Sequence, residues 1–168
     1  GAAGFIGSHV RDRLLNDGMH VLGFDNLCDF YDPQIKRANL ASALYHPQFT
    51  MIEADIRDAK AVEQACAQHK PRTVIHLAAM AGVRPSIENP AYYTAVNLDG
   101  TVNLLNAAAQ HGVEKFIFAS SSSVYGNNEK VPFSEDDPVD HPISPYAATK
   151  KAGELICHTY HHLYQLPM

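Results

Sequence analysis

Gly1-Ala2-Ala3-Gly4-Phe5-Ile6-Gly7 opens the chain and decides the interpretation of its fold. The three glycines follow a G-x-x-G-x-x-G spacing, and glycine permits a tight turn that a ligand can approach closely. Apolar residues at helical spacing follow from Ile6 to Leu15, until Asn16-Asp17-Gly18 ends the segment. A helix that begins at such a loop offers free N–H groups and a partial positive charge to a pyrophosphate. The stretch therefore predicts a phosphate-binding loop, although glycine-rich turns are common and the motif alone is weak evidence.

The rest of the chain alternates short apolar runs with helical patterns, which is typical of a parallel α/β sheet. We therefore predict a Rossmann-type, doubly wound parallel sheet. The predicted strands are Met19 to Phe24, Phe49 to Ala54, Thr73 to Leu77 and Lys115 to Ala119, and the further helices are Asp32 to Leu44, Asp58 to Gln68, Ala91 to His111 and Pro145 to Leu163. Polar loops are predicted for Ala78 to Pro90 and Asn127 to Pro145.

The ends of the chain suggest a fragment. A phosphate loop of this kind follows directly after a buried strand, yet Gly1 is the first residue. The last residues, Leu166-Pro167-Met168, come just after a long predicted helix. We expect residues 1–168 to form one dinucleotide-binding domain that is incomplete at both ends. Since the missing first strand is central in this fold, the sheet should have a gap.

The overall composition disfavours several classes of protein. The 168 residues suit one domain, 46% are hydrophobic and 18% charged, and the net charge of -5 disfavours a nucleic-acid partner. No apolar run approaches the roughly 18 residues of a membrane span. Three widely spaced cysteines without a CxxC indicate reduced thiols in a cytoplasmic protein. His158, His161 and His162 share a helix face, but we expect solvated or packed histidines and no metal.

Two aspartates close predicted strands and are candidates for nucleotide binding. Asp25 lies 18 residues beyond Gly7, where an acid is expected to bind the adenosine ribose diol. A carboxylate there repels a 2′-phosphate, which favours NAD over NADP. The alternative for Asp25 is a turn residue before Asn26. Asp55 could accept from the adenine amino group, and a cap or turn role is an equal alternative.

Tyr146-Ala147-Ala148-Thr149-Lys150 brings a phenol and an ammonium onto one helix face. A free tyrosine has a pKa near 10, and a neighbouring ammonium lowers it toward the range of a useful base. Such a pair is frequent by chance. Here, however, the predicted strand Lys115 to Ala119 runs into four serines at the edge where doubly wound sheets bind ligands. Together with the phosphate loop, this predicts hydride chemistry on an alcohol or ketone.

With these motifs in place, the chain resembles the extended short-chain dehydrogenase/reductases, and among them the nucleotide-sugar epimerases. The segments that carry the resemblance are Gly1 to His9, Asp25-Asn26-Leu27, Asp55 to Asp58, His76 to Ala79, Asn97, Ser120 to Gly126 and Ser144 to Lys150. Ala81 to Pro90, Pro132 to Asp136 and His141 to Ser144 are most similar to the UDP-glucuronate 4-epimerases, except that Pro85 stands where an aromatic residue is common.

The resemblance implies roles for individual residues. Tyr146 would be the base, Lys150 its partner and a ribose ligand, and Ser121 the catalytic hydroxyl, with Ser122 and Ser123 as alternates. Arg84 and Ser86 would lie near the sugar, with Arg84 on its carboxylate; a plain surface arginine is the alternative. The residues expected to bind NAD are Gly1, Gly4, Phe5, Ile6, Gly7, Asp25, Asn26, Asp55, Ile56, Leu77, Ala78, Ala79, Asn97, Ser120, Tyr146 and Lys150.

The resemblance also implies a reaction and an assembly. Tyr146 would remove the 4-hydroxyl proton while the C4 hydride moves to NAD, and return of the hydride to the other face of the 4-keto sugar would give UDP-galacturonate for polysaccharide biosynthesis. A C-terminal substrate domain and a homodimer would complete the protein. A nucleotide-sugar 4,6-dehydratase is disfavoured because Ser121 to Val124 contains no Asp-Glu pair. Another UDP-sugar epimerase, a UDP-glucuronate decarboxylase and a non-catalytic NAD-binding domain stay open.

Overall fold

A computed structural model describes all 168 residues. Its strands are β1 (Val21–Asp25), β2 (Phe49–Glu53), β3 (Thr73–His76) and β4 (Lys115–Phe118). Its α-helices are α1 (Phe5–Asn16), α2 (Pro33–Leu40), α3 (Ala59–His69), α4 (Val83–Glu88), α5 (Pro90–Thr94), α6 (Gly100–Gln110) and α7 (Pro145–Tyr164). Two 3₁₀ segments, η1 (Ala43–Tyr45) and η3 (Ser122–Tyr125), and a π-helical segment, η2 (Ala95–Asp99), complete it. None of the helices is both long and apolar enough to cross a lipid bilayer.

The helix starts follow from local capping chemistry. Asp32 accepts from the backbone N–H of Gln34, Asp58 from that of Ala61, and Ser144 from that of Ala147. In α2 and α7 a proline follows the cap, where its missing N–H costs no hydrogen bond. These caps place the helix starts within a residue of the predictions.

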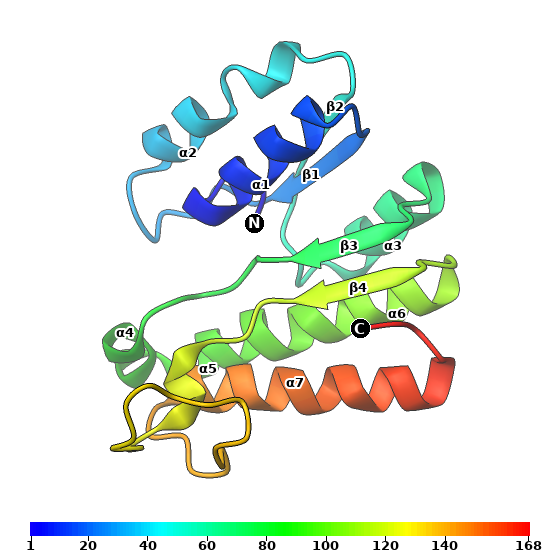
Figure 1. Ribbon diagram of the computed structural model, residues 1–168. Helices are drawn as coiled ribbons and strands as arrows, with labels where there is room; N and C mark the ends of the chain where they lie inside the picture. The colour runs from blue at the N-terminus through cyan, green and yellow to red at the C-terminus, as the bar shows by residue number, and fades with distance from the viewer.

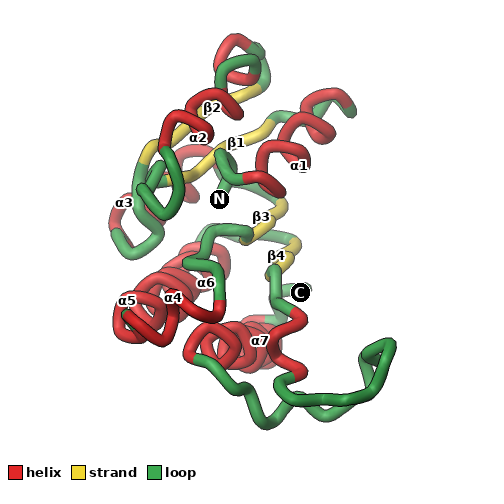
Figure 2. Tube along the Cα trace, turned by 90° about the vertical axis from the view of Figure 1, so that its left-hand side faces the viewer, coloured by secondary structure: helices red, strands yellow, loops and turns green.

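The strands form two parallel pairs, which confirms the predicted α/β class. β1 pairs with β2 in the register Val21 to Phe49, and β3 pairs with β4 in the register Thr73 to Lys115. No backbone hydrogen bonds join β1 to β3, so the sheet is divided where the sequence predicted a gap (Figure 1). Figure 2 shows α1 on one side of the strands and α3 with α6 on the other, the arrangement expected of a doubly wound sheet.

Two expectations about the middle of the chain are wrong. The predicted loop from Ala78 to Pro90 contains helix α4, which begins after Gly82 at φ 93°. The predicted single helix from Ala91 to His111 consists of α5, η2 and α6 in succession, with a π-helical turn in its middle. Asn97 at the centre of this turn is buried and bonded to other elements. Sequence periodicity does not register such tertiary bonds. π-helical turns occur mostly as single turns inside α-helices, as here.

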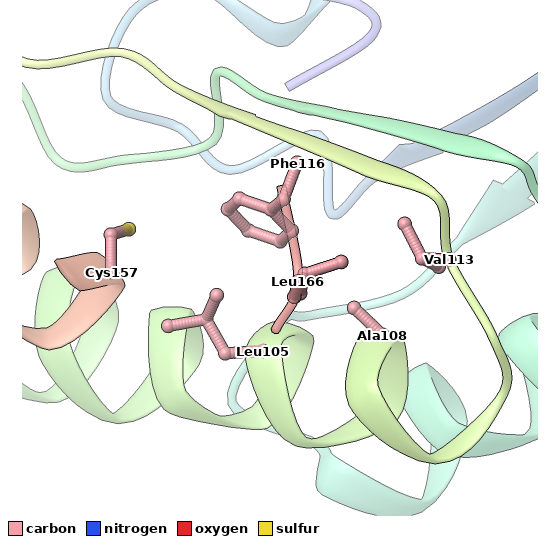
Figure 3. Packing of buried hydrophobic residues seen from close by; sticks show 6 residues of the cluster. All are labelled: Leu105, Ala108, Val113, Phe116, Cys157 and Leu166. Atoms are coloured by element: carbon pink, nitrogen blue, oxygen red, sulfur yellow. The ribbon is translucent and has the colours of Figure 1, made fainter. Parts of the chain in front are cut away.

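The largest core cluster lies between β4, α6 and α7 (Figure 3). Phe116 of β4 is fully buried at its centre, and Leu166 closes it from beyond the end of α7. Backbone bonding holds the closing segment, since the N–H of Phe116 donates to the Pro167 carbonyl at 2.8 Å. A second cluster beneath the candidate site contains Ile56, Met80, Tyr93 and Val96, with Tyr146 packed against it. The core therefore fixes the helix that carries Tyr146 at both ends.

A buried histidine gives the fold a predictable weakness in acid. His76 Nε2 lies 2.9 Å from Thr101 Oγ1, whose hydroxyl donates to the Asn97 carbonyl, so Nε2–H is the donor in this pair. Burial, aided by the charge of Lys150, lowers the pKa of His76 to about 3. An unfolded histidine has a pKa near 6.5, so on acidification the unfolded state takes up a proton before the folded state does. This linkage removes stability as the pH falls from about 6.5 toward 3.

We therefore expect the free energy of unfolding to fall by about 2 kcal/mol between pH 6.5 and pH 5 on account of His76 alone. Urea titrations at the two pH values measure this difference. The variant His76→Asn should lose correspondingly less over the same interval, whereas His158→Asn, which changes an exposed histidine of α7, should keep the full loss. An equal loss in wild type and His76→Asn would contradict the assignment.

Candidate dinucleotide and catalytic site

The glycine loop lies between the carboxyl ends of β1 and β3. The N–H of Ala2 donates to the Phe24 carbonyl at 3.3 Å, and a Cβ on Gly1 would stand 2.6 Å from the backbone nitrogen of Ala78. A Cβ on Gly7 would collide with the carbonyl oxygen of Gly1. Neither position therefore admits a side chain. The loop brings bare backbone to the edge of the sheet at the start of α1.

Buried polar side chains hold the loop in this shape. Asp25 accepts from the Ala3 N–H at 3.1 Å, and Asn39 donates to the Ala3 carbonyl at 3.0 Å. Arg11, only 2% exposed, donates to the Ala2 carbonyl and, at 2.6 Å, to the Asn39 carbonyl. Arg11 thus joins α1, α2 and the glycine loop.

A cavity of about 360 Å³ opens beside the glycine loop. It is lined by nearly all of the residues that the sequence predicted for a dinucleotide, from six different segments of the chain. Those that line it are Gly1, Gly4, Phe5, Ile6, Gly7, Asp25, Asn26, Asp55, Ile56, Leu77, Ala78, Ala79, Ser120, Tyr146 and Lys150. The volume lies in the usual range of small-molecule sites.

Carboxylates mark the end of the cavity at β1 and β2. Asp25 accepts from the N–H of Ala3 in the glycine loop and, at Oδ1, from the N–H of Leu27 at 2.9 Å. It therefore also stabilises the turn that was the alternative prediction for this residue. Asp55 accepts from Arg57 and from the Asn26 amide, and these bonds, chiefly those from Arg57, lower its pKa to about 2. Asp55 therefore builds a turn at the cavity wall, the alternative foreseen for it, and its oxygens already have donors.

Lys36 lines the same end of the cavity and was not predicted. Its side chain is buried, its Nζ lies 3.1 Å from Cys28 Sγ and 3.9 Å from Asp25 Oδ1, and the Tyr31 ring lies 5.1 Å away. A thiol is a weak acceptor, so most of the hydrogen-bonding capacity of this ammonium is unused. Its position on a helix did not indicate this role, because lysines on helices are usually exposed.

Tyr146 and Lys150 lie at the other end of the cavity, one helical turn apart on α7. Lys150 is 5% exposed, donates from Nζ to the Ala119 carbonyl at 2.8 Å and lies over the Phe118 ring. Burial lowers the pKa of Lys150 to about 8, so it still carries its charge at neutral pH. The helix thus places a half-buried phenol near a buried cation at the carboxyl edge of β4.

The serine run is arranged differently from the prediction. Ser120 lines the cavity but donates its hydroxyl to Glu154 of α7. Ser121, Ser122 and Ser123 are not among the lining residues; Ser121 caps η3 by accepting from the Ser123 N–H, and the two hydroxyls bond each other. The segment packs against α7, the helix that carries Tyr146. Ser121, predicted to be the catalytic hydroxyl, thus caps η3 in this structure.

Three further predicted residues lie outside the cavity. Arg84 is exposed on α4, and the Ser86 hydroxyl, fully buried, donates to the Val83 carbonyl within the same helix. Asn97 accepts from the Met80 N–H, and its amide group donates to the Met80 carbonyl and to Thr149. Its amide is used behind the cavity wall, where it joins the loop after β3 to α7.

Comparison with known proteins identifies the family of this chain. Residues 1–168 match the family described as GDP-mannose 4,6 dehydratase. The chain belongs to the GDP-mannose 4,6-dehydratase family. UDP-glucuronate 4-epimerase 1 of Arabidopsis thaliana is 50% identical over 167 residues, which are 99% of this chain and 39% of the relative. The predicted likeness to the nucleotide-sugar epimerases of the extended short-chain dehydrogenase/reductases is thereby confirmed.

Solved structures of a nucleotide-sugar epimerase and a nucleotide-sugar dehydratase have the same fold. UDP-glucuronic acid 4-epimerase of Bacillus cereus, in complex with UDP-glucuronic acid and NAD, superposes with a TM-score of 0.90 at 37% identity, over 99% of this chain and 52% of that one. DesIV, a dTDP-glucose 4,6-dehydratase of Streptomyces venezuelae, gives 0.89 at 33% identity over 99% and 51%. The chain therefore spans about half the length of these relatives.

Proposed function

We propose that the chain supplies the NAD-binding and catalytic groups of a UDP-sugar 4-epimerase, with UDP-glucuronate as substrate and UDP-galacturonate as product. The observation that carries the proposal is that Tyr146 and Lys150 line the same cavity as the glycine loop and Asp25. A nucleotide site and a tyrosine that can act as a base are thereby brought together. The names of the relatives at 44–50% identity support the choice of sugar.

The cavity suits NAD at both ends. The glycine loop offers side-chain-free backbone and the N-terminus of α1 to a pyrophosphate, and Asp25 offers a carboxylate to a ribose diol. When bound, NAD would supply the hydride acceptor for C4 of the sugar and, as NADH, the hydride donor to the opposite face. The remaining chemistry belongs to the side chains at the other end of the cavity.

In this proposal Tyr146 exchanges a proton with the 4-hydroxyl of the sugar. The phenolate needs a nearby positive charge, and Lys150 supplies one below its pKa of about 8. The Ala119 carbonyl fixes the Lys150 ammonium at 2.8 Å, so the charge is held in place. Ser121 would exchange its bond to Ser123 for one to the sugar 4-oxygen, because catalytic hydrogen bonds often form only in the substrate complex.

Arg84 and Ser86 are the residues of α4 that we propose to act at the sugar. Arg84 is exposed on α4 and makes no ion pair within the chain, so its guanidinium is free to meet a carboxylate. Ser86 contributes by fixing the first turn of α4 through Val83. In the intact protein we also propose a cytoplasmic homodimer, which the family resemblance and the three free cysteines favour.

Incubation of the intact gene product with UDP-glucuronate and NAD, with the products resolved by NMR, tests the proposal. UDP-galacturonate without accumulated NADH would support it. A 4-keto-6-deoxy product from another nucleotide sugar would assign a dehydratase, the activity named for one of the structural neighbours. A different epimer would retain the reaction class and overturn the choice of sugar, and no product from any nucleotide sugar would favour a non-catalytic NAD-binding domain.

Lys36 provides a separate test of the NAD site. Because its buried ammonium has unused donors beside Asp25, we expect it to donate to the adenosine ribose. Lys36→Met should weaken NAD binding roughly tenfold, the size of one charge-assisted hydrogen bond, as measured by calorimetry. Lys60→Met, which changes an exposed lysine of α3, is the control and should bind like wild type. Unchanged affinity in Lys36→Met would place the ribose elsewhere.

A further inference from the structure

Tyr93 is a buried aromatic residue directly behind Tyr146. It lies in α5 with 1% of its surface exposed, and its ring meets the Tyr146 ring with centroids 6.3 Å apart and planes at 83°. This is the edge-to-face geometry that aromatic pairs prefer. Tyr93 does not line the cavity, so its contact is with the tyrosine and not with a ligand.

The hydroxyl of Tyr93 is fully committed elsewhere. It donates to the carbonyl oxygen of Ala81, a residue that does line the cavity. Burial, with a contribution from Tyr146, raises the pKa of Tyr93 above its usual value, so this phenol stays protonated. Tyr93 is therefore no competing base. Burial holds its ring in place, and the fixed ring limits how far the Tyr146 ring can tilt.

The backbone of Tyr146 is held from the same segment of the chain. Thr149 donates its hydroxyl to the Tyr146 carbonyl at 2.8 Å and accepts from the Asn97 amide at 3.0 Å. Asn97 also accepts from the N–H of Met80 at 2.8 Å. Tyr93 and Asn97 stand four residues apart, on α5 and on the π-helical turn that follows it. One short segment thus contacts both the ring and, through Thr149, the backbone of Tyr146.

We propose that Tyr93 is a positioning residue for Tyr146, acting through the edge-to-face contact of the two rings. The inference rests on the proposed function, in which Tyr146 exchanges a proton with the sugar. A phenol whose ring can tilt no longer holds its oxygen at the distance that proton transfer requires, and a displacement of about 1 Å can cost on the order of a hundredfold in rate. Ground-state binding of sugar and NAD does not depend on that distance.

Steady-state kinetics of Tyr93→Leu and Tyr93→Phe in the intact protein test this role. Tyr93→Leu should lower kcat at least tenfold, with KM for the UDP-sugar and the NAD dissociation constant within about twofold of wild type. Tyr93→Phe keeps the ring and should retain kcat within about threefold. If the leucine variant does not fold, Tyr93→Met fills the volume with a flexible side chain and serves in its place.

Tyr160→Leu is the matched control. Tyr160 also has a bonded hydroxyl, to Asn106, and an aromatic neighbour, Tyr164, but it lies far along α7 from Tyr146. A loss of kcat in Tyr160→Leu equal to that in Tyr93→Leu would overturn the proposal, as would a Tyr93→Phe variant as slow as Tyr93→Leu. Turnover retained in Tyr146→Phe would instead overturn the proposed function, so the two failures are distinguishable.

Discussion

Tyr146→Phe is expected to lower kcat by about 10³-fold while leaving the NAD dissociation constant within twofold of wild type. The substitution removes one oxygen atom and keeps the ring, so the packing on Tyr93 and on the cluster beneath it is retained. A lower kcat with an unchanged NAD affinity would therefore report on the phenolic hydroxyl alone. Single-turnover kinetics with UDP-glucuronate, together with calorimetric NAD titration, measure the two quantities.

Tyr164→Phe is the control for this experiment. Tyr164 is exposed near the end of the same helix, away from the cavity, and its variant should turn over like wild type. Near-normal turnover in Tyr146→Phe would remove Tyr146 from the role of base. A variant that loses NAD binding together with turnover would show that the hydroxyl serves the cofactor site first, and the proton-transfer assignment would then fail.

Lys150→Met is expected to abolish most activity and yet to stabilise the fold. Burial lowers the pKa of Lys150 from 10.5 to about 8, so keeping it charged at pH 7 costs the folded state about 3 kcal/mol. Methionine fills the space of the lysine stem without a charge. Allowing about 2 kcal/mol for the lost charge-assisted hydrogen bond to Ala119, we expect a net gain of about 1 kcal/mol. Turnover should fall by 10² or more, since the phenolate loses its cation.

The pH dependence of stability distinguishes the cost of burying the Lys150 charge from a packing effect of the methionine. Above pH 8 the folded protein has released the Lys150 proton while the unfolded chain, with a pKa near 10.4, retains it. The unfolded state then binds more protons, so wild-type stability rises with pH, by about 1 kcal/mol between pH 7 and 9. Lys150→Met lacks this rise, and its advantage should shrink accordingly in urea titrations without cofactor.

The neighbouring lysine supplies the control. Lys151 pairs with Glu154 at the partly exposed side of α7, and Lys151→Met should change neither turnover nor the pH slope substantially. A Lys150→Met variant that is less stable than wild type at pH 7 would mean that the hydrogen bond to Ala119 outweighs the cost of burying the charge. A constant difference between pH 7 and 9 would contradict the lowered pKa.

Most of the cavity could be predicted from the sequence because its residues stand at fixed places in the pattern. A glycine loop, an acid at the end of a strand and a Tyr-x-x-x-Lys pair on a helix are local features, and strand ends meet at one edge of a parallel sheet. Backbone geometry alone then places Gly1, Asp25 and Tyr146 around one space. The capping bond of Ser121 was not part of that pattern, since it forms because a hydroxyl next to free N–H groups caps the nearest turn.

The sequence by itself determined the α/β class and the helix starts at Asp32, Asp58 and Pro145, because capping and periodicity act within a few residues. It also determined the convergence of the glycine loop with Tyr146, because the carboxyl ends of parallel strands meet at one edge of the sheet. Only the tertiary structure decided what the buried polar groups do. Lys36 and Lys150 become buried cations, and Asn97 becomes a brace, through partners 8 to 52 residues away in the chain. Burial and such long-range partners set their bonding and, for Lys150, its pKa, and neither is encoded in local sequence.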